Sequence, residues 1–550
     1  MLKEIKEFFT GGKTEATEAF DSSMKDDALI TQINRWEEET SDYFGLLKRI
    51  WEKNLAYYHG IQTDSDRIQG KNSKTVDNRI WMAVETMIPI ASARLPDIIL
   101  KPGEESDLAQ INALQTQDVL NYHLDRVGIQ SISERFLRDM LTKRYGVMKA
   151  CWDFRNDDVG VKYVDARRLR FPKFGTTIDE LAFVIEDMEM SYDRVVEYFG
   201  EEKAKELLKS VKQEDKSDKK YRKATYLIQE VWTNDYVCWK TGHIILDKKP
   251  NPYYDFKNLK KNFFNAPKKP YIIKSLFETD ESIIGDTDYI QQCLSLQDNI
   301  NTRKRQIEDI TNKVGNPYLL IDSDTMSEEE AANITNEPGA IIYGRDAASG
   351  TKIRFETPGQ VPAYMFSDLE FSIKDFDNIF GIHSTTRGER EGKETLGGRQ
   401  ILREADMGRI DQVARQFERA LDDLANYWIQ LMKLFYTDKQ SFSILGEDGV
   451  RFVTDFTGEK IGNVKPLVRM GSTLKEDEAS IKQNAIILWQ NKAIGLKTLY
   501  KMLRIPNMQE AMNDFIETQS GQILRPAQPV QEPVGQPQPQ EAVQPQQNAV

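Results

Sequence analysis

The sequence predicts a mainly helical α+β protein, and three observations support this. Apolar residues recur every three or four positions over residues 286–314, 363–380 and 400–435, which is the spacing of amphipathic helices. Short alternating runs bounded by Gly, Asp or Pro, within residues 147–173 and 224–247, predict small sheets. With 550 residues, 39% hydrophobic and 29% charged, the chain can bury a full core in about two to four regions.

The N-terminal part is predicted to be an arm followed by helices. Residues 1–29 mix acids and lysines and lack the apolar core of a signal peptide. The apolar run at 80–100 is broken by Glu85, Pro89, Arg94 and Pro96, so we expect a buried helix there and no membrane span. The predicted helices are 29–59, 79–94, 106–126, 131–144 and 191–212.

The central part is predicted to contain two long helices that flank a compact insertion. At 1.5 Å per residue, 286–314 would be roughly 43 Å long and 400–435 roughly 54 Å. Between 286–314 and 363–380, the sequence predicts strands at 316–322, 338–344 and 351–356 and a helix start at Ser327. This pattern indicates a small α/β insertion at the end of two antiparallel helices.

The C-terminal part is predicted to contain strands, then helices, then a tail. Strand-like runs lie at 441–446, 451–456 and 465–470, and helical patterns span 475–517. The last thirty or so residues are rich in Gln and Pro, and we expect them to be disordered.

A charged, glycine-containing loop joins the helices at 363–380 and 400–435. Residues 383–399 hold four cations, three anions and four glycines, with Leu396 as the only large hydrophobe. Such a loop cannot fold on its own apolar contacts. On spacing and charge alone, a solvated loop and a DNA-facing loop remain equally open.

The same loop contains glycines and Lys393, which raises the question of nucleotide binding. A Walker A motif needs four residues between its glycines and a hydroxyl directly after the lysine. Here three residues separate Gly388 and Gly392, and Glu394 stands in the place of the hydroxyl. We retain a nucleotide-dependent phosphate-loop enzyme or motor component as the alternative function.

No residue pattern in the sequence indicates an enzyme active site. The four histidines and three cysteines lie apart, without metal-ligand or catalytic-triad spacing. We therefore expect no catalytic residue, no cofactor and no metal. The net charge of −13 argues against nonspecific adsorption to duplex DNA, so any DNA contact should be local and weak.

Two basic segments have more than one interpretation. The cluster Arg303, Lys304 and Arg305 is either a solvated helix face, which we favour, or pairs with the acidic helix that carries Asp368, Glu370, Asp375 and Asp377. Such exposed pairs contribute about 0–1 kcal/mol each. The lysine- and aromatic-rich segment 248–269 could bind single strands, but we expect a long solvated loop because its aromatics have no strand framework.

The order of these elements resembles the portal (head-to-tail connector) proteins of tailed bacteriophages. The resemblance spans about residues 30–517 and is clearest in TTRGEREGKETLGGRQILREADMGRIDQVARQFERAL, which is similar to the tunnel loop and following wing helix of that family. The segments NRIWMAVETMIPIASARLPDI, YGVMKACWDF and LSLQDNINTRKRQIED are also similar, at their expected places.

The resemblance implies a portal fold with the following regions. Residues 1–29 would be an N-terminal arm, 30–285 the wing, 286–314 and 363–381 the two stem helices, 315–362 the clip, 382–399 the tunnel loop, 400–470 the long wing helix and wing strands, 471–517 a small crown and 518–550 a disordered tail. The chain departs from larger relatives because its Pro/Gln-rich tail cannot form an extended helical barrel.

The resemblance also implies function and partners. Portals form a ring, typically of twelve subunits, at one capsid vertex of the virion, and assemble in the host cytoplasm. Double-stranded DNA passes through the ring without sequence specificity during packaging and ejection. The terminase large subunit and the head–tail adaptor dock on the clip, and the major capsid and scaffolding proteins surround the ring. A third possible function is that of a scaffold or adaptor without a DNA channel, and such a protein would lack ring stoichiometry.

The site residues follow from the same resemblance. We expect Arg387, Arg390, Lys393 and Arg399 to face DNA, and the acidic residues Asp324, Glu328, Glu329 and Glu330 to face the terminase or adaptor. Packing of the stem helices would involve Arg303, Lys304, Arg305, Asp368 and Asp375.

Overall fold

The computed structural model describes residues 26–62, 73–93, 97–154, 156–212, 225–279, 281–315, 318–321, 324, 327–329, 353–356, 359–382, 396–445, 451–468, 485–491 and 493–503. The chain divides into a large unit, residues 1–444 with 453–475, and a small unit, residues 445–452 with 476–550. Each is described by itself.

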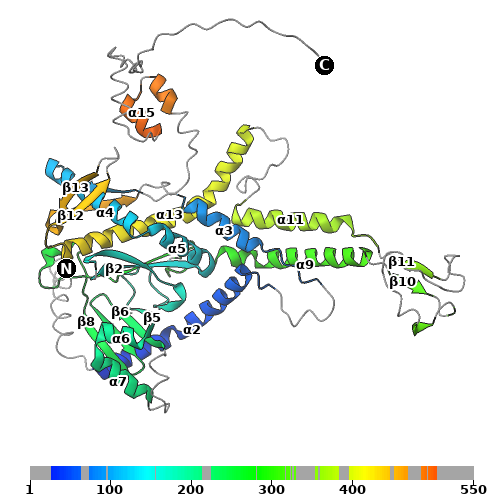
Figure 1. Cartoon of the computed structure of the whole chain (residues 1–550), viewed down its shortest axis with the longest axis horizontal. Coiled ribbons are helices and arrows are strands. Elements are labelled where there is room, and N and C mark those ends of the chain that lie inside the picture. The colour runs from blue at the N-terminus through cyan, green and yellow to red at the C-terminus, as the bar shows by residue number, and fades with distance from the viewer. Residues whose placement is uncertain are drawn as a thin grey trace, which may run out of the picture. The chain divides into compact units, whose positions relative to one another are not determined.

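The elements follow the predicted order (Figure 1). The helices are α2 (Asp26–Tyr58), α3 (Arg79–Ala91), α4 (Asp107–Arg126), α5 (Ile129–Lys143), α6 (Tyr192–Phe199), α7 (Glu201–Lys212), α9 (Tyr289–Gly315), α11 (Ala363–Phe380), α13 (Leu396–Phe435) and α15 (Leu496–Leu503). The strands are β1 (Ile98–Pro102), β2 (Tyr145–Asp153), β3 (Asp158–Tyr163), β4 (Leu169–Arg170), β5 (Val184–Ser191), β6 (Thr225–Trp232), β7 (Tyr236–Thr241), β8 (Ile244–Pro250), β9 (Tyr271–Ser275), β10 (Tyr318–Ile321), β11 (Ile353–Glu356), β12 (Gln440–Leu445), β13 (Arg451–Phe456) and β14 (Val464–Val468).

Helix α13 forms the centre of the main core. Its predicted stripe is fully buried at Val413, Phe417, Leu424 and Trp428, and the helix packs against β2, β3 and β9 and against α3 and α5. The indole Nε1 of Trp428 also donates to the carbonyl oxygen of Gly160 on β3 at 3.0 Å. A helix with this wide an apolar stripe is stabilised mainly by such packing.

The two largest sheets of the large unit are antiparallel. One has the order β3-β2-β9, and the other has the order β4-β5-β6-β7-β8. The turn between β7 and β8 contains Gly242 with a φ of 54°, a left-handed conformation that glycine adopts without strain.

A buried lysine links the two sheets. Nζ of Lys149 on β2 lies 2.7 Å from a carboxylate oxygen of Glu186 on β5 and 2.7 Å from one of Glu230 on β6. The hydroxyl of Tyr271 on β9 donates to Glu186 at 2.7 Å. Desolvation lowers the pKa of Lys149, but the charges of Glu230 and Glu186 outweigh it and leave the pKa raised. The lysine therefore stays charged inside the core.

Strand β1 was not predicted. The sequence predicted a helix to residue 94, but α3 ends at Ala91 and residues 98–102 pair antiparallel with β14, more than 360 positions later. Side chains of α4 satisfy the other edge of β1, since Gln117 and Asn121 accept from the amides of Leu100 and Ile98 at 3.0 Å. Because β14 lies so far from β1 in the sequence, no local pattern around residues 98–102 indicates this pairing.

The prediction of a solvated loop for residues 248–269 was wrong for part of the segment: residues 257–261 are exposed, but the residues on either side of them pack against the core. Asn251, Tyr254 and Lys269 within it are at most 6% exposed. Gln430 on α13 is fully buried and accepts from the amides of Phe263 and Phe264 at 2.6 and 2.9 Å. A buried glutamine that satisfies the backbone of an irregular segment replaces the strand framework that the sequence lacked.

The remaining predictions for this part of the chain concern cysteines and membranes. Cys238 and Cys293 are buried free thiols, and burial raises the pKa of each to about 12. Across the described ranges, no helix is both long enough and apolar enough to cross a membrane.

In the small unit, α15 and the helical residues 485–490 fall within the predicted helical region 475–517. The predicted tail lies outside the described residues.

Candidate functional site

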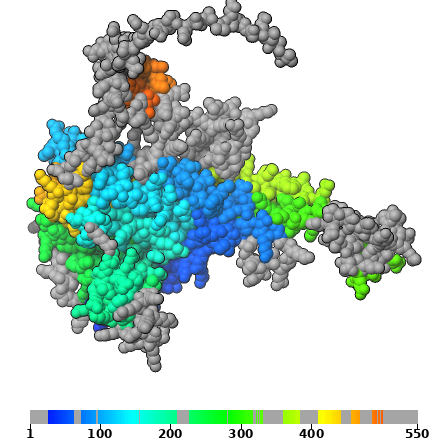
Figure 2. Space-filling view, viewed as in Figure 1, coloured from blue at the N-terminus to red at the C-terminus, as the bar shows by residue number. Residues whose placement is uncertain are grey.

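Helices α9 and α11 run side by side and antiparallel (Figure 1). At the N-terminal end of α9 and the C-terminal end of α11, the rings of Tyr289 and Phe380 stack with centroids 5.5 Å apart. Farther along, Nδ2 of Asn299 donates to the hydroxyl of Ser372 at 2.9 Å. In the space-filling view the projecting parts of the two helices lie against each other (Figure 2).

The predicted cation cluster on α9 does not act as one group. Nε of Arg303 lies 2.5 Å from Asp368 on α11, but Lys304 lies 2.8 Å from Asp77 and Nε of Arg305 donates to the carbonyl of Thr75 at 2.9 Å. Asp375 is exposed. Successive residues of a helix point about 100° apart, so three in a row cannot face one partner.

Residues 73–78, here called the strap, lie along α9. Asn301 accepts from the amide of Asp77 at 2.9 Å, and Asp309 accepts from the amide of Ser73 at 2.7 Å. The hydroxyls of Ser73 and Thr75 both donate to Glu308. The sequence signal for this contact was the row of polar residues on one face of α9, at 297, 301, 304 and 308, together with the polar residues of the strap.

The ionic contacts of the strap shift two carboxyl groups. Burial raises the pKa of Asp77, but Lys304 and Arg79 outweigh it and lower the pKa overall. The hydroxyls of Ser73 and Thr75 lower the pKa of Glu308. Both groups are therefore carboxylates at neutral pH and hold the strap in their charged form.

The helix pair ends sharply at Gly381. This residue has a φ of 70°, its amide donates to the carbonyl of Asp377 at 2.7 Å, and an added Cβ would meet Cδ of Arg409 at 2.6 Å. A glycine in the left-handed conformation is the usual end of a helix. The fully buried Phe380 and Ile382 on either side anchor the point where the charged loop begins.

The predicted DNA-facing residues lie after this point. Arg387, Arg390 and Lys393 fall within 383–395, outside the described residues. Arg399 differs from the prediction: α13 starts at Leu396, so Arg399 lies on its first turn and not in the loop.

The insertion between α9 and α11 contains an antiparallel pair, β10 with β11, in the register Tyr318 to Glu356. Two of its predicted strands are therefore present, and the third, at 338–344, lies outside the described residues. Of the predicted acidic residues, Asp324, Glu328 and Glu329 are exposed. Glu330 also lies outside the described residues.

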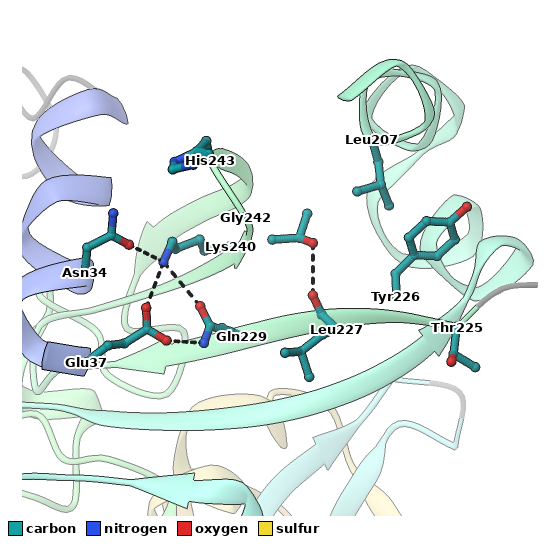
Figure 3. A pocket seen from close by; sticks show the side chains of 11 residues that line it. Asn34, Glu37, Leu207, Thr225, Tyr226, Leu227, Gln229, Lys240, Gly242 and His243 are labelled. Atoms are coloured by element: carbon teal, nitrogen blue, oxygen red, sulfur yellow. Dashed lines mark hydrogen bonds and ion pairs between the residues drawn. The ribbon is translucent and has the colours of Figure 1, made fainter. Parts of the chain in front are cut away.

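A pocket of about 610 Å³ lies between α2, β6 and the β7–β8 turn (Figure 3). In it, Nζ of Lys240 lies 2.6 Å from Asn34, 3.2 Å from Glu37 and 3.3 Å from Gln229. Lys240 is only 3% exposed, and Glu37 compensates its charge. The lysine is thus a structural link between α2 and the sheet and is not available to an anionic ligand.

The comparison with protein families decides the identity of the chain. Residues 186–550 match the model of the phage P22-like portal protein family, which is well over half of the sequence. The chain belongs to that family. No curated protein matches it.

As a phage portal protein, the chain is a structural component of the virion at a capsid vertex, in a family that forms oligomeric rings. The resemblance stated from the sequence is confirmed. The alternative, a nucleotide-dependent enzyme, finds no support in this match.

Proposed function

We propose that this portal protein forms the ring through which double-stranded DNA enters the capsid during packaging and leaves it during ejection. The observation that carries the proposal is the family match together with an antiparallel helix pair, α9 and α11, that bears a strand module at one end and a charged junction at the other. In this proposal α9 and α11 are the stem, and residues 315–362 are the clip.

Residues 30–285, together with the long helix and strands of 400–470, serve as the wing, and residues 471–517 serve as a small crown. The ring has twelve subunits, and the major capsid and scaffolding proteins enclose it. The terminase large subunit and later the head–tail adaptor dock on the clip, through Asp324, Glu328, Glu329 and Glu330. The exposed positions of Asp324, Glu328 and Glu329 support this assignment.

DNA contact is local and weak in this proposal. The protein carries a net charge of −13, so its surface as a whole repels a polyanion. Arg387, Arg390, Lys393 and Arg399 supply a few phosphate contacts per subunit, which exchange rapidly because each pairing is solvated. Such contacts guide the duplex without holding it.

The decisive experiment is native mass measurement with negative-stain imaging of the purified protein. We expect a closed ring with a central pore wide enough for duplex DNA. A monomer at all accessible concentrations, or a closed assembly without a pore, would overturn the proposal.

A further inference from the structure

The side of α11 that faces α9 is the only strip of α11 that is consistently buried in the single chain. Met365, Ser372, Phe376 and Phe380 on this strip are at most 6% exposed. They are spaced four or seven residues apart, as one face of a helix requires.

Large apolar side chains also occupy the two flanks of α11, where they are exposed. Tyr364 and Phe371 are 68% and 67% exposed, and because they are seven residues apart they share one flank. Phe366, 47% exposed, and the half-buried Ile373 are also seven apart and share the other flank. Phe366 lies about 200° around the helix from Tyr364.

The strip of α11 that faces away from α9 is polar. Ser367, Glu370 and Lys374 are all exposed there. The exposed aromatic rings are therefore confined to two opposite flanks, which a random scatter of surface apolar residues would not produce.

The strap covers α9 on the side away from α11. Asn301 and Glu308 contact the strap, whereas Asn299 and Arg303 contact α11. Strap, α9 and α11 thus form a flat layer with two broad faces. One face carries Tyr364 and Phe371, and the other carries Phe366 and Ile373.

We propose that each broad face packs against the opposite face of a second copy of this chain, with Tyr364 and Phe371 of one copy meeting the Phe366 and Ile373 face of the next. A closed ring needs a heterologous contact, in which two different surfaces of each subunit meet. Two faces on opposite sides of one layer, each with exposed aromatic side chains, meet that requirement, although the Tyr364 face also carries Asp368 and Asp375. Aromatic residues are enriched in such contacts. The proposal rests on the proposed ring and assigns its stem contact to named residues.

The test uses two single variants of the full chain, Phe371→Asp and Phe366→Asp. Each breaks one face, so we expect each to lose the ring and to remain monomeric in native mass spectra. Both side chains are exposed in the single chain, so circular dichroism should match the wild type, and Tm should match that of the wild-type chain diluted until it is monomeric. Lys374→Asp is the matched control, since it places the same charge on the polar strip and should leave the ring intact.

Mixing the two variants tests the heterologous geometry itself. The Phe366→Asp chain keeps the Tyr364 face and the Phe371→Asp chain keeps the Phe366 face, so a 1:1 heterodimer should appear that cannot close into a ring. If an aspartate variant lowers Tm, the uncharged Tyr364→Ala/Phe371→Ala variant should still shift ring formation to higher protein concentration.

Three outcomes separate the ideas. Full rings from either aspartate variant, or from their mixture, overturn the assigned contact and leave the proposed function standing. A wild-type protein that forms no ring overturns the proposed function instead. Loss of the ring in Lys374→Asp as well would show that the flanks are not specific, and would also overturn the contact.

Discussion

At the scale of single residues, the buried charge of Lys149 links the two sheets. The sequence places this lysine in the apolar run VMKACWDF and predicts a strand there, and β2 confirms that strand. Its partners Glu186 and Glu230 lie 37 and 81 positions away, so local sequence gave no sign of the network.

We predict that Lys149→Met destabilises the protein by about 3–5 kcal/mol, because it leaves two buried carboxylates without their cation. Urea unfolding followed by tryptophan fluorescence measures the effect. A triple variant, Lys149→Met with Glu186→Gln and Glu230→Gln, removes the unpaired charges and should recover part of the loss. Wild-type stability in Lys149→Met alone would contradict the prediction.

His123 is the second residue whose environment decides its chemistry. Its ring is fully buried, packs edge-on against Phe442 and Trp428, and places Nε2 3.1 Å from the hydroxyl of Tyr436. Burial, together with the charge of Arg126, lowers the pKa of His123 to about 3. The unfolded chain binds this proton near pH 6.5 and the folded protein does not.

We therefore predict that stability falls as pH decreases from about 6.5 toward 3, by about 1.4 kcal/mol per pH unit from this one group. The contribution is fully present above pH 6.5, because histidine is then neutral in both states. His123→Phe keeps the aromatic packing and should flatten the pH profile of the unfolding free energy between pH 6.5 and 5. Parallel profiles for the two proteins would contradict the assignment.

At the scale of elements, the strap ties α9 to the start of α3. Gln297 and Asn301 are at most 1% exposed. Gln297 accepts from the amide of Arg79 at 3.1 Å and donates to the carbonyl of Asp77 at 2.6 Å. The buried side-chain amides of Gln297 and Asn301 thus form the hydrogen bonds that the backbone of an isolated extended segment would lack.

We predict that Asn301→Ala weakens this attachment by about 1–3 kcal/mol, because the amide of Asp77 loses its acceptor. Hydrogen exchange of residues 73–79 should become faster, as measured by mass spectrometry. Thr302→Ala is the control, since its exposed hydroxyl bonds within α9 at Asp298. Equal protection in both variants would show that Asn301 does not hold the strap.

At the scale of the whole molecule, the predictions concern assembly and DNA. We predict that Arg390→Ala/Lys393→Ala leaves ring assembly intact but alters DNA packaging or retention, because it removes phosphate contacts and no core packing. Packaged DNA protected from nuclease measures the effect. The control Glu389→Ala/Glu391→Ala removes two charges of opposite sign from the same loop. Unchanged packaging in the basic variant would refute the role.

The sequence by itself determined the α+β class, the order of elements and the family, because long apolar stripes and short alternating runs are local patterns. The period of α13 needed no distant partner. Tertiary structure alone decided the β1–β14 pair, the packing of residues 248–269 on Gln430, the strap on α9 and the separate partners of Arg303, Lys304 and Arg305. Each of these contacts joins residues far apart in the sequence. The favourable free energy of such a contact is gained only when folding has brought both residues together, so no local pattern reports it.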